Sequence, residues 1–394
     1  MTDFVDETTA DIRLTLDGIL GGSIPEAAWL QSCLPIRLGG LGVQNPSLTY
    51  YAAFFSSGLA ECSGAYSPNG EQALPNEALR AVAEKLSGQI GPDQILITCS
   101  SEGALPPAGQ ILQHELYKQK YWSDKVHTQV QQDLYVSAPL RDKLRLQSEK
   151  AAHAGAWIGA VPNDNLGFRF GNAEHQLLLS FHLGLPILPD AAAGAPCDDC
   201  GQPLDVYGDH LVSCRLGGAW DRHNKVGSTI ASIATSAGLN VQREVQIHGK
   251  QRPADLLLTN FVNGQDVAVD LTVIHSVLPS RPWEPHKLAV DQAEATKTAK
   301  YQECCTTAGV HFFPLGMDAF GAFGTQGSDL LGKLFHKYAG RVAVGDEQRF
   351  PGQFQRECWQ RVSVALRRGV AAQLCRALTQ LGGTVAPPFP AGEQ

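Results

Sequence analysis

The spacing of hydrophobic positions makes the first half of the chain look helical. Apolar residues recur at helical intervals over Ser47–Ala60, Glu77–Leu86 and Gly109–Ala156. Glycine and proline separate these stretches, and a proline-rich segment ending at Pro189 interrupts the pattern. We therefore expect a mostly helical region over residues 1–189.

The pattern changes after the first half, because short apolar runs of strand length now alternate with longer helical ones. The turn pair Asn263-Gly264 lies between two of these runs and predicts a hairpin. The order of elements favours an α/β layer structure. The predicted elements are a helix at Trp220–Gly238, strands at Leu239–Ile247, Ala254–Thr259 and Asp266–Ile274, a helix at Leu288–Thr307, a strand at His311–Leu315, and helices at Ser328–Tyr338 and Arg349–Leu381.

Four regions follow from these patterns. The helical region is expected to end at residue 189, and a small module with closely spaced cysteines would occupy residues 190–216. An α/β domain would span residues 217–340, and a C-terminal helical extension with a proline-rich tail would span residues 341–394.

Composition indicates an ordinary globular protein, with 43% hydrophobic and 18% charged residues among 394. No apolar run approaches the roughly 20 residues of a membrane span, and the N-terminus lacks the basic start of a signal peptide. With ten unevenly spaced cysteines, this predicts an intracellular, reducing location.

The formal net charge of −8 argues against a protein that coats nucleic acid by bulk charge. Residues 341–380 are the most basic block, with seven arginines and three acidic residues. These arginines could form a stripe that faces DNA, or they could be the solvated face of an amphipathic helix, which charge runs more often are.

A zinc site is predicted by the spacing Cys197-x2-Cys200-x9-His210-x3-Cys214. Three thiolates and one imidazole suit a tetrahedral zinc ion, and one helical turn would direct His210 and Cys214 to the same point. The alternative is three free cysteines and an unrelated histidine. Because aspartates make this module acidic, we expect it to brace the next domain and not to grip phosphates.

A second cluster consists of acidic residues and lysines. Asp255 and Asp270 lie on the two strands of the predicted hairpin, and Glu244 could join them from the preceding strand. Lys297 and Lys300 share one face of the following helix. Carboxylates that hold a divalent metal beside a lysine are what phosphodiester cleavage needs, but structural salt bridges would use the same residues.

These motifs resemble the C-terminal part of non-LTR retrotransposon proteins, which carry a restriction-enzyme-like endonuclease of the PD-(D/E)XK class. A glycine-rich segment upstream resembles the part that follows the polymerase fingers and palm, in the thumb or linker region. The residues that carry the resemblance are Arg222-His223, Glu244, Arg252-Pro253-Ala254-Asp255, Val269-Asp270-Leu271-Thr272-Val273, Lys297 and Lys300-Tyr301, preceded by the Cys-Cys-His-Cys module, and Trp29–Gly42 upstream.

The resemblance implies a PD-(D/E)XK-like α/β/α core. In it, Asp255 and Asp270 would bind Mg²⁺ or Mn²⁺ and Lys297 would be the lysine that has moved from strand to helix. The sequence departs from the family pattern in two places: Ala254 separates the proline from Asp255, and Thr272 stands where an acid-x-lysine end would begin. The second departure agrees with the displaced lysine.

The function expected from the resemblance is nicking of a DNA target by a metal-dependent endonuclease, with Glu244 assisting. His223, Lys300 and Tyr301 are second-rank candidates for the same site. No Tyr-x-Asp-Asp polymerase motif occurs in the sequence, so no polymerase activity is expected. The partners would be DNA and the element's RNA, in the nucleus, without a membrane or nucleotide cofactor. The rival is a nucleic-acid-binding or docking remnant that has lost cleavage.

Overall fold

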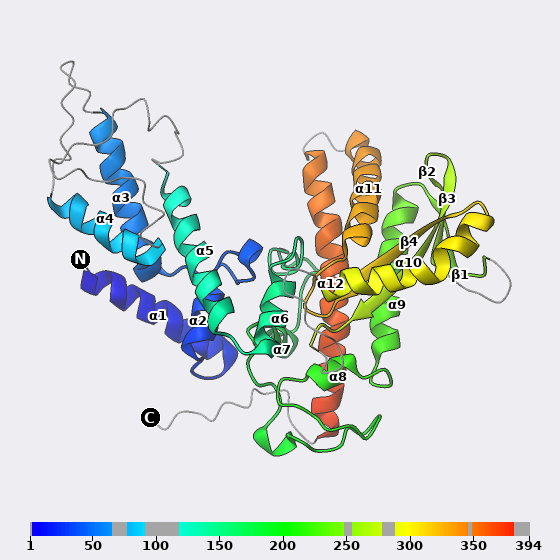
Figure 1. The fold of residues 1–394 in the computed structure, drawn as a ribbon, viewed down its shortest axis with the longest axis horizontal. Coiled ribbons are helices and arrows are strands. Elements are labelled where there is room, and N and C mark those ends of the chain that lie inside the picture. Colours follow the sequence, from blue (N-terminus) through cyan, green and yellow to red (C-terminus); the bar gives the residue numbers. More distant parts are fainter. Residues whose placement is uncertain are drawn as a thin grey trace. The chain divides into compact units, whose positions relative to one another are not determined.

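A computed structural model describes residues 2–64, 77–90, 118–247, 254–277, 288–345 and 349–381 (Figure 1). The chain divides into two compact units. The first comprises residues 1–18 and 25–137, and the second residues 19–24 and 138–394. Within the described ranges, no helix combines the length and apolar character that crossing a membrane requires.

The first unit is helical, with a core in which Phe55, Leu86 and Trp122 are buried. Its glycine-rich turn is tightly packed, because a Cβ on Gly40 would lie 2.0 Å from the carbonyl oxygen of Leu34. Gly39 has a left-handed backbone with φ of 85°, which ends the short helix before it. The elements are α1 (Thr2–Leu20, which runs into the second unit), α2 (Glu26–Cys33), η1 (Ile36–Leu38), α3 (Pro46–Gly64), α4 (Glu77–Ile90) and α5 (Gln119–Ser137).

The second unit contains the sheet and the remaining helices. Its elements are α6 (Leu140–Glu149), α7 (Asn172–His182), η3 (Asp190–Ala192), α8 (Asp209–Ser213), α9 (Ala219–Ser236), β1 (Asn240–Val245), β2 (Ala254–Val262), β3 (Gln265–Ile274), α10 (Ala289–Thr307), β4 (His311–Asp318), α11 (Thr325–Val342), η4 (Ala343–Gly345) and α12 (Pro351–Gln380).

The described strands form one mixed sheet in the order β1-β2-β3-β4. The first three strands are antiparallel, and β4 runs parallel to β3 after the crossover helix α10. Asn263 and Gly264 have φ values of 51° and 82°, as a two-residue hairpin turn requires, so the predicted hairpin is confirmed. The mixed α/β class predicted from the sequence is also confirmed.

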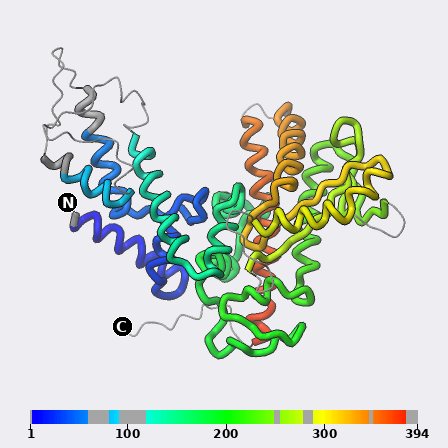
Figure 2. The backbone as a smooth tube through the Cα atoms, viewed as in Figure 1, coloured from blue at the N-terminus to red at the C-terminus, as the bar shows by residue number. Residues whose placement is uncertain are grey.

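Helices cover both faces of the sheet (Figures 1 and 2). Val269 and Leu271 of β3 belong to the large core shared with α9, α11 and α12, whereas Ala268 packs with Tyr301 of α10. Because side chains alternate along a strand, Asp270 falls on the same side as Ala268. The alternation thus places a carboxylate on the face that α10 covers.

Helix α12 is more deeply buried than an amphipathic extension would be. It packs against α9 and α11, and Phe354, Trp359 and Leu366 lie in the sheet's main core. Arg367 is fully buried and donates hydrogen bonds to the carbonyl oxygens of Ala319 and Phe320. The stripe facing DNA is therefore wrong for Arg367, which is part of the interior.

Residues 138–189 belong to the same compact unit as the sheet, and the main division between the two units falls at 137–138. Side chains explain the association. Ser148 hydrogen-bonds Ser276 just past β3 at 3.1 Å, and the backbone N–H of Trp157 donates to Ser363 of α12 at 3.2 Å. The cysteine module and α12 are also part of this unit.

Candidate functional site

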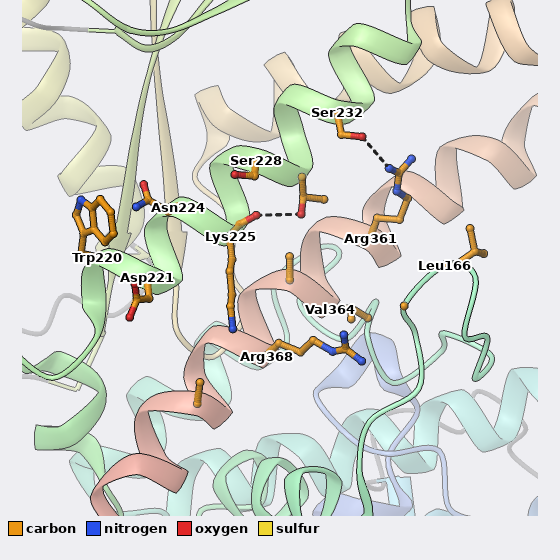
Figure 3. A pocket seen from close by; sticks show the side chains of 14 residues that line it. Leu166, Trp220, Asp221, Asn224, Lys225, Ser228, Ser232, Arg361, Val364 and Arg368 are labelled. Atoms are coloured by element: carbon orange, nitrogen blue, oxygen red, sulfur yellow. Dashed lines mark hydrogen bonds between the residues drawn. The ribbon is translucent and has the colours of Figure 1, made fainter.

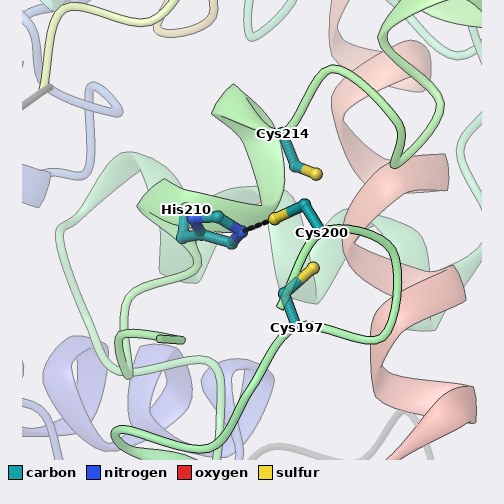
Figure 4. Close-up of side chains that lie close together, drawn as sticks. All are labelled: Cys197, Cys200, His210 and Cys214. Carbon is teal, nitrogen blue, oxygen red and sulfur yellow. Dashed lines mark hydrogen bonds between the residues drawn. The ribbon is translucent and has the colours of Figure 1, made fainter. Parts of the chain in front are cut away.

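The predicted zinc ligands form a cluster that could hold a metal ion. The ligand atoms of Cys197, Cys200, His210 and Cys214 all lie within 4.8 Å of one another (Figure 4). The Sγ of Cys200 and the Nε2 of His210 are 3.2 Å apart. Sulfur–metal bonds of about 2.3 Å in a tetrahedron would set sulfurs about 3.8 Å apart, so a slight contraction would complete a zinc site.

Backbone geometry positions the ligands. Gly201 has a φ of 73°, and its N–H donates to the carbonyl of Cys197 at 2.7 Å, which closes the turn between the two cysteines. On the other side, the Asp205 carboxylate accepts the N–H groups of Tyr207, Asp209 and His210, at 2.7 to 3.0 Å, and holds the start of α8. This short helix brings His210 to the cysteines.

The surroundings of the cluster shift two of its thiols in opposite directions. A hydrogen bond from the backbone N–H of Gln202 lowers the pKa of the Cys200 thiol, which favours the thiolate that a metal needs. Burial raises the pKa of Cys214, although the N–H groups of Leu216 and Gly217 act in the opposite direction. Three sulfurs and one imidazole nitrogen are a donor set typical of structural zinc.

The second cluster lies where β2 and β3 pair. Leu256 pairs with Val269 and Leu257 with Ala268, so the register carried one residue further sets Asp255 opposite Asp270. The charge of Asp255 raises the cost of charging Asp270. The structure thus brings together the two aspartates that the hairpin predicted.

Asp255 is held by α9 and β3. Its Oδ2 accepts the N–H of Leu271 at 2.6 Å and lies 3.2 Å from the Nε2 of His223. The same ring nitrogen is 3.1 Å from the carbonyl oxygen of Leu271. The hydrogen bond to Asp255 raises the pKa of His223, because the carboxylate favours the charged imidazolium.

Asp270 is a buried carboxylate beside one lysine. The Lys297 Nζ lies 2.7 Å from its Oδ2, and the two side chains are 30% and 7% exposed. Burial raises the pKa of Asp270, the ion pair with Lys297 opposes this, and the charge of Asp255 adds to the rise. Burial is the larger cause of the raised pKa, ahead of the repulsion between the two carboxylates.

Lys300 and Tyr301 lie beside this ion pair. The Lys300 Nζ is 4.6 Å from the centroid of the Tyr301 ring, and that of Lys297 is 5.7 Å away. Tyr301 is buried against Phe312. A hydrogen bond with Tyr301 raises the pKa of Lys300. The Tyr301 ring thus contacts both lysines. Within the described chain, Tyr301 forms no hydrogen bond with the aspartates.

Glu244 aligns with the aspartates but does not touch them. Arg243 pairs with Leu256 and Val245 with Ala254, so the register sets Glu244 opposite Asp255. Its backbone is left-handed with φ of 52°, its side chain is exposed, and among the described residues its carboxylate forms no hydrogen bond or ion pair. Arg252 and Pro253 of the predicted motif lie outside the described residues.

Sequence reasoning missed a buried ionic group that joins the cysteine module to the sheet. The Asp209 carboxylate lies 3.0 Å from the Nε2 of His275, and the Arg141 guanidinium donates to both of its oxygens at 2.7 and 3.2 Å. Asp209 precedes the ligand His210, and His275 directly follows β3. A histidine extending an apolar strand was the available signal, but nothing local indicated its partner.

Comparison with known proteins identifies no relative: no protein-family model matches the chain, and no protein of curated function matches it.

Proposed function

We propose that this chain is a metal-dependent DNA endonuclease that nicks a target, derived from a non-LTR retroelement and without polymerase activity of its own. The proposal assigns a restriction-enzyme-like core to the sheet with α9 and α10. It is supported by the motif resemblance, by the order of cysteine module and sheet, and by the grouping of Asp255, Asp270, His223 and Lys297.

The observation that carries the proposal is the contrast between two buried carboxylates. Glu294 accepts the backbone N–H groups of Gly316, Gln326 and Gly327, each at 2.9 Å, and so is fully satisfied by the fold. Asp270 accepts no backbone hydrogen bond in the described structure and has a lysine beside it instead. A carboxylate buried without fixed donors is disfavoured unless a cation compensates it.

The donor set suits a hard divalent ion. Asp255 and Asp270 would hold Mg²⁺ or Mn²⁺, since carboxylate oxygens on adjacent strands are the ligands that such ions prefer. When bound, the ion would supply Lewis acidity and activation of water at neutral pH.

The other residues have separate roles in this proposal. Lys297, which is part-exposed and bound to a single carboxylate, offsets charge on the scissile phosphate. His223 orients Asp255 through the contact with its Oδ2. Glu244, on the strand next to Asp255, assists from the exposed edge of the sheet. Lys300 adds positive charge beside Lys297.

A structural zinc ion would complete the Cys197-Cys200-His210-Cys214 cluster. The contact of Asp209 with His275 supports a bracing role, because it ties the residue before a ligand to the end of β3. The purified chain should contain one zinc per molecule by elemental analysis, and Cys197→Ser with Cys214→Ser should contain none. Equal zinc in both proteins would contradict the assignment.

Nicking of supercoiled plasmid in Mg²⁺ or Mn²⁺ tests the function. Asp270→Ala should reduce nicking by at least about 10³-fold while DNA binding is retained, because it removes a metal ligand and no phosphate contact. Glu303→Ala, at an exposed carboxylate elsewhere on α10, should nick as the unmodified chain does. Full activity in Asp270→Ala would place any cleavage elsewhere and overturn the proposal.

A second candidate is a docking remnant that binds nucleic acid without cutting it. The observation in its favour is that the network is already paired: Lys297 compensates Asp270, while His223 and the Leu271 N–H occupy Asp255 Oδ2. Such a remnant would bind DNA equally with and without Mg²⁺ and would not nick plasmid.

A further inference from the structure

A groove lies between α9 and α12, on the side of α9 away from the acidic cluster. It has a volume of about 780 Å³. Asn224, Lys225 and Ser228 line it from α9, and Arg361 and Arg368 from α12 (Figure 3). Its volume falls in the range of ligand pockets, roughly 300–1,000 Å³. It can therefore accept parts of a flexible chain.

Positive charge in this groove is not balanced. Lys225, Arg361 and Arg368 face it with a single carboxylate, Asp221, and none of these three cations forms an ion pair in the part of the chain that the structure describes. Arg361 makes one long hydrogen bond, 3.4 Å to Ser232, so most of its donors stay available. Arg368 is more engaged, because it donates to the carbonyl oxygen of Arg169 and lies over the Phe170 ring, but it keeps its charge without a carboxylate partner in the described chain.

Three other arginines of this region are paired or buried, whereas Arg356 is exposed outside the groove. Arg349 pairs with Glu357 at 2.7 Å, Arg376 pairs with Asp199 at 2.9 Å, and Arg367 is fully buried. The fold therefore sorts the basic block: some arginines brace the interior, while Arg361 and Arg368 join Lys225 at the groove. In a chain with net charge −8, this concentration of unpaired cations points to an anionic ligand.

The groove also has an aromatic side chain at its mouth. Trp220, at the start of α9, is 74% exposed and lines the groove together with the partly exposed Leu166. An exposed indole costs free energy in water and offers a flat surface on which a base can stack. Cations that follow a backbone and an aromatic platform for bases are the two elements of single-strand binding.

We propose that this groove binds single-stranded nucleic acid, with Lys225, Arg361 and Arg368 on the phosphates and Trp220 stacked on a base. His223, next to Asn224 in α9, faces the acidic cluster, so the groove and that cluster lie on two sides of one helix. A bound strand would thus be held beside the acidic site without entering it. The inference does not depend on cleavage, because it stands on the groove alone.

Fluorescence anisotropy of a labelled oligothymidylate of about fifteen nucleotides, without added divalent metal, tests the proposal on the full chain. Lys225→Glu and Arg361→Glu should each weaken binding about tenfold or more, and Lys225→Gln should lower the salt slope by about 0.7. Trp220→Leu should weaken binding about fivefold or more and remove part of the quenching of tryptophan emission. Arg356→Glu is the matched control, since Arg356 is exposed on α12 outside the groove.

Each alternative has its own outcome. Equal weakening by Arg356→Glu would mean general charge attraction, and tighter binding of a duplex with the same dependence on Lys225 and Arg361 would exclude a single-strand groove. A polyglutamate peptide that competes as well as the oligonucleotide would identify an acidic peptide site instead. The same measurement with a labelled oligouridylate shows whether the groove prefers RNA or DNA. If the groove variants lose binding of the oligonucleotide but still nick plasmid, the groove proposal is supported and the endonuclease proposal is unaffected.

Discussion

Two histidine–aspartate contacts lie beside strand β3, and they differ in how far they are exposed to solvent. Midway along it, His223 meets Asp255 beside the Asp270–Lys297 ion pair, and the side chains of His223 and Asp255 are 25% and 21% exposed. Just past its end, His275 meets Asp209, with the two side chains 0% and 10% exposed.

The cation at each place accounts for the difference. Arg141 donates to both oxygens of Asp209 and stacks on Tyr207, which fixes a planar pair in a closed site. Lys297 holds Asp270 through a single point charge on a flexible stem, next to open solvent. The closed group is suited to holding two parts of a fold together, whereas the open one can exchange its cation for a ligand.

The largest expected effect breaks the closed group. Asp209→Asn should lower the free energy of unfolding by about 3 kcal/mol, because it removes the bidentate partner of the part-buried Arg141, which keeps only Asp142 at 2.9 Å. Asp270→Asn should change it by no more than about 1 kcal/mol, since Lys297 can turn to solvent. Urea unfolding of both variants measures this. Equal losses would mean that both groups are structural.

Next in size is the contrast between the two lysines of α10. Lys297→Met should reduce plasmid nicking by about 10²-fold, as expected for loss of a charge that stabilises a phosphate. Lys300→Met should reduce it less than about threefold, because Lys300 lies at the rim on the Tyr301 ring. If both variants nick alike, Lys297 has no special place in the reaction.

The smallest effect is a pH dependence of stability from His223. Its pKa is raised in the folded chain, so its stabilisation is complete below the unfolded value of about 6.5 and is lost as the pH rises through the folded value. The unmodified chain should therefore lose stability over that window, and His223→Gln should lose less. Urea unfolding at several pH values detects this, with the exposed His336→Gln as control. Identical pH profiles for all three proteins would mean that the contact of His223 with Asp255 does not contribute to stability.

Local signals made much of the α/β region predictable. The Asn263-Gly264 turn predicted the hairpin, but its register alone, with Val262 opposite Gln265, would set Asp255 opposite Thr272. A bulge between Leu258 and Val262 shifts the pairing, so that Asp255 lies opposite Asp270. The metal cluster was equally accessible, because its ligands are close in sequence and one helical turn joins His210 to Cys214.

Tertiary burial was not predictable in the same way. Arg367 and Arg368 are adjacent in the chain, yet one is in the core and the other lines a groove, and only the packing of α12 decides between them. The contact of Asp209 with His275 joins residues 66 positions apart, with no pattern in either segment to announce it. The type of each residue indicated what chemistry it could perform, but long-range packing determined whether its side chain lies in the core or at the surface.

The central place of α12 has a consequence for how the chain folds during synthesis. Phe354, Trp359 and Leu366 supply part of the core against which β2 and β3 pack, although those strands end about 80 to 90 residues before α12 begins. On the ribosome, the sheet therefore emerges long before the helix that covers it, with Leu256 and Val269 still exposed to water. The second unit can complete its core only when its last helix has left the exit tunnel, which makes the nascent sheet a natural client for chaperones.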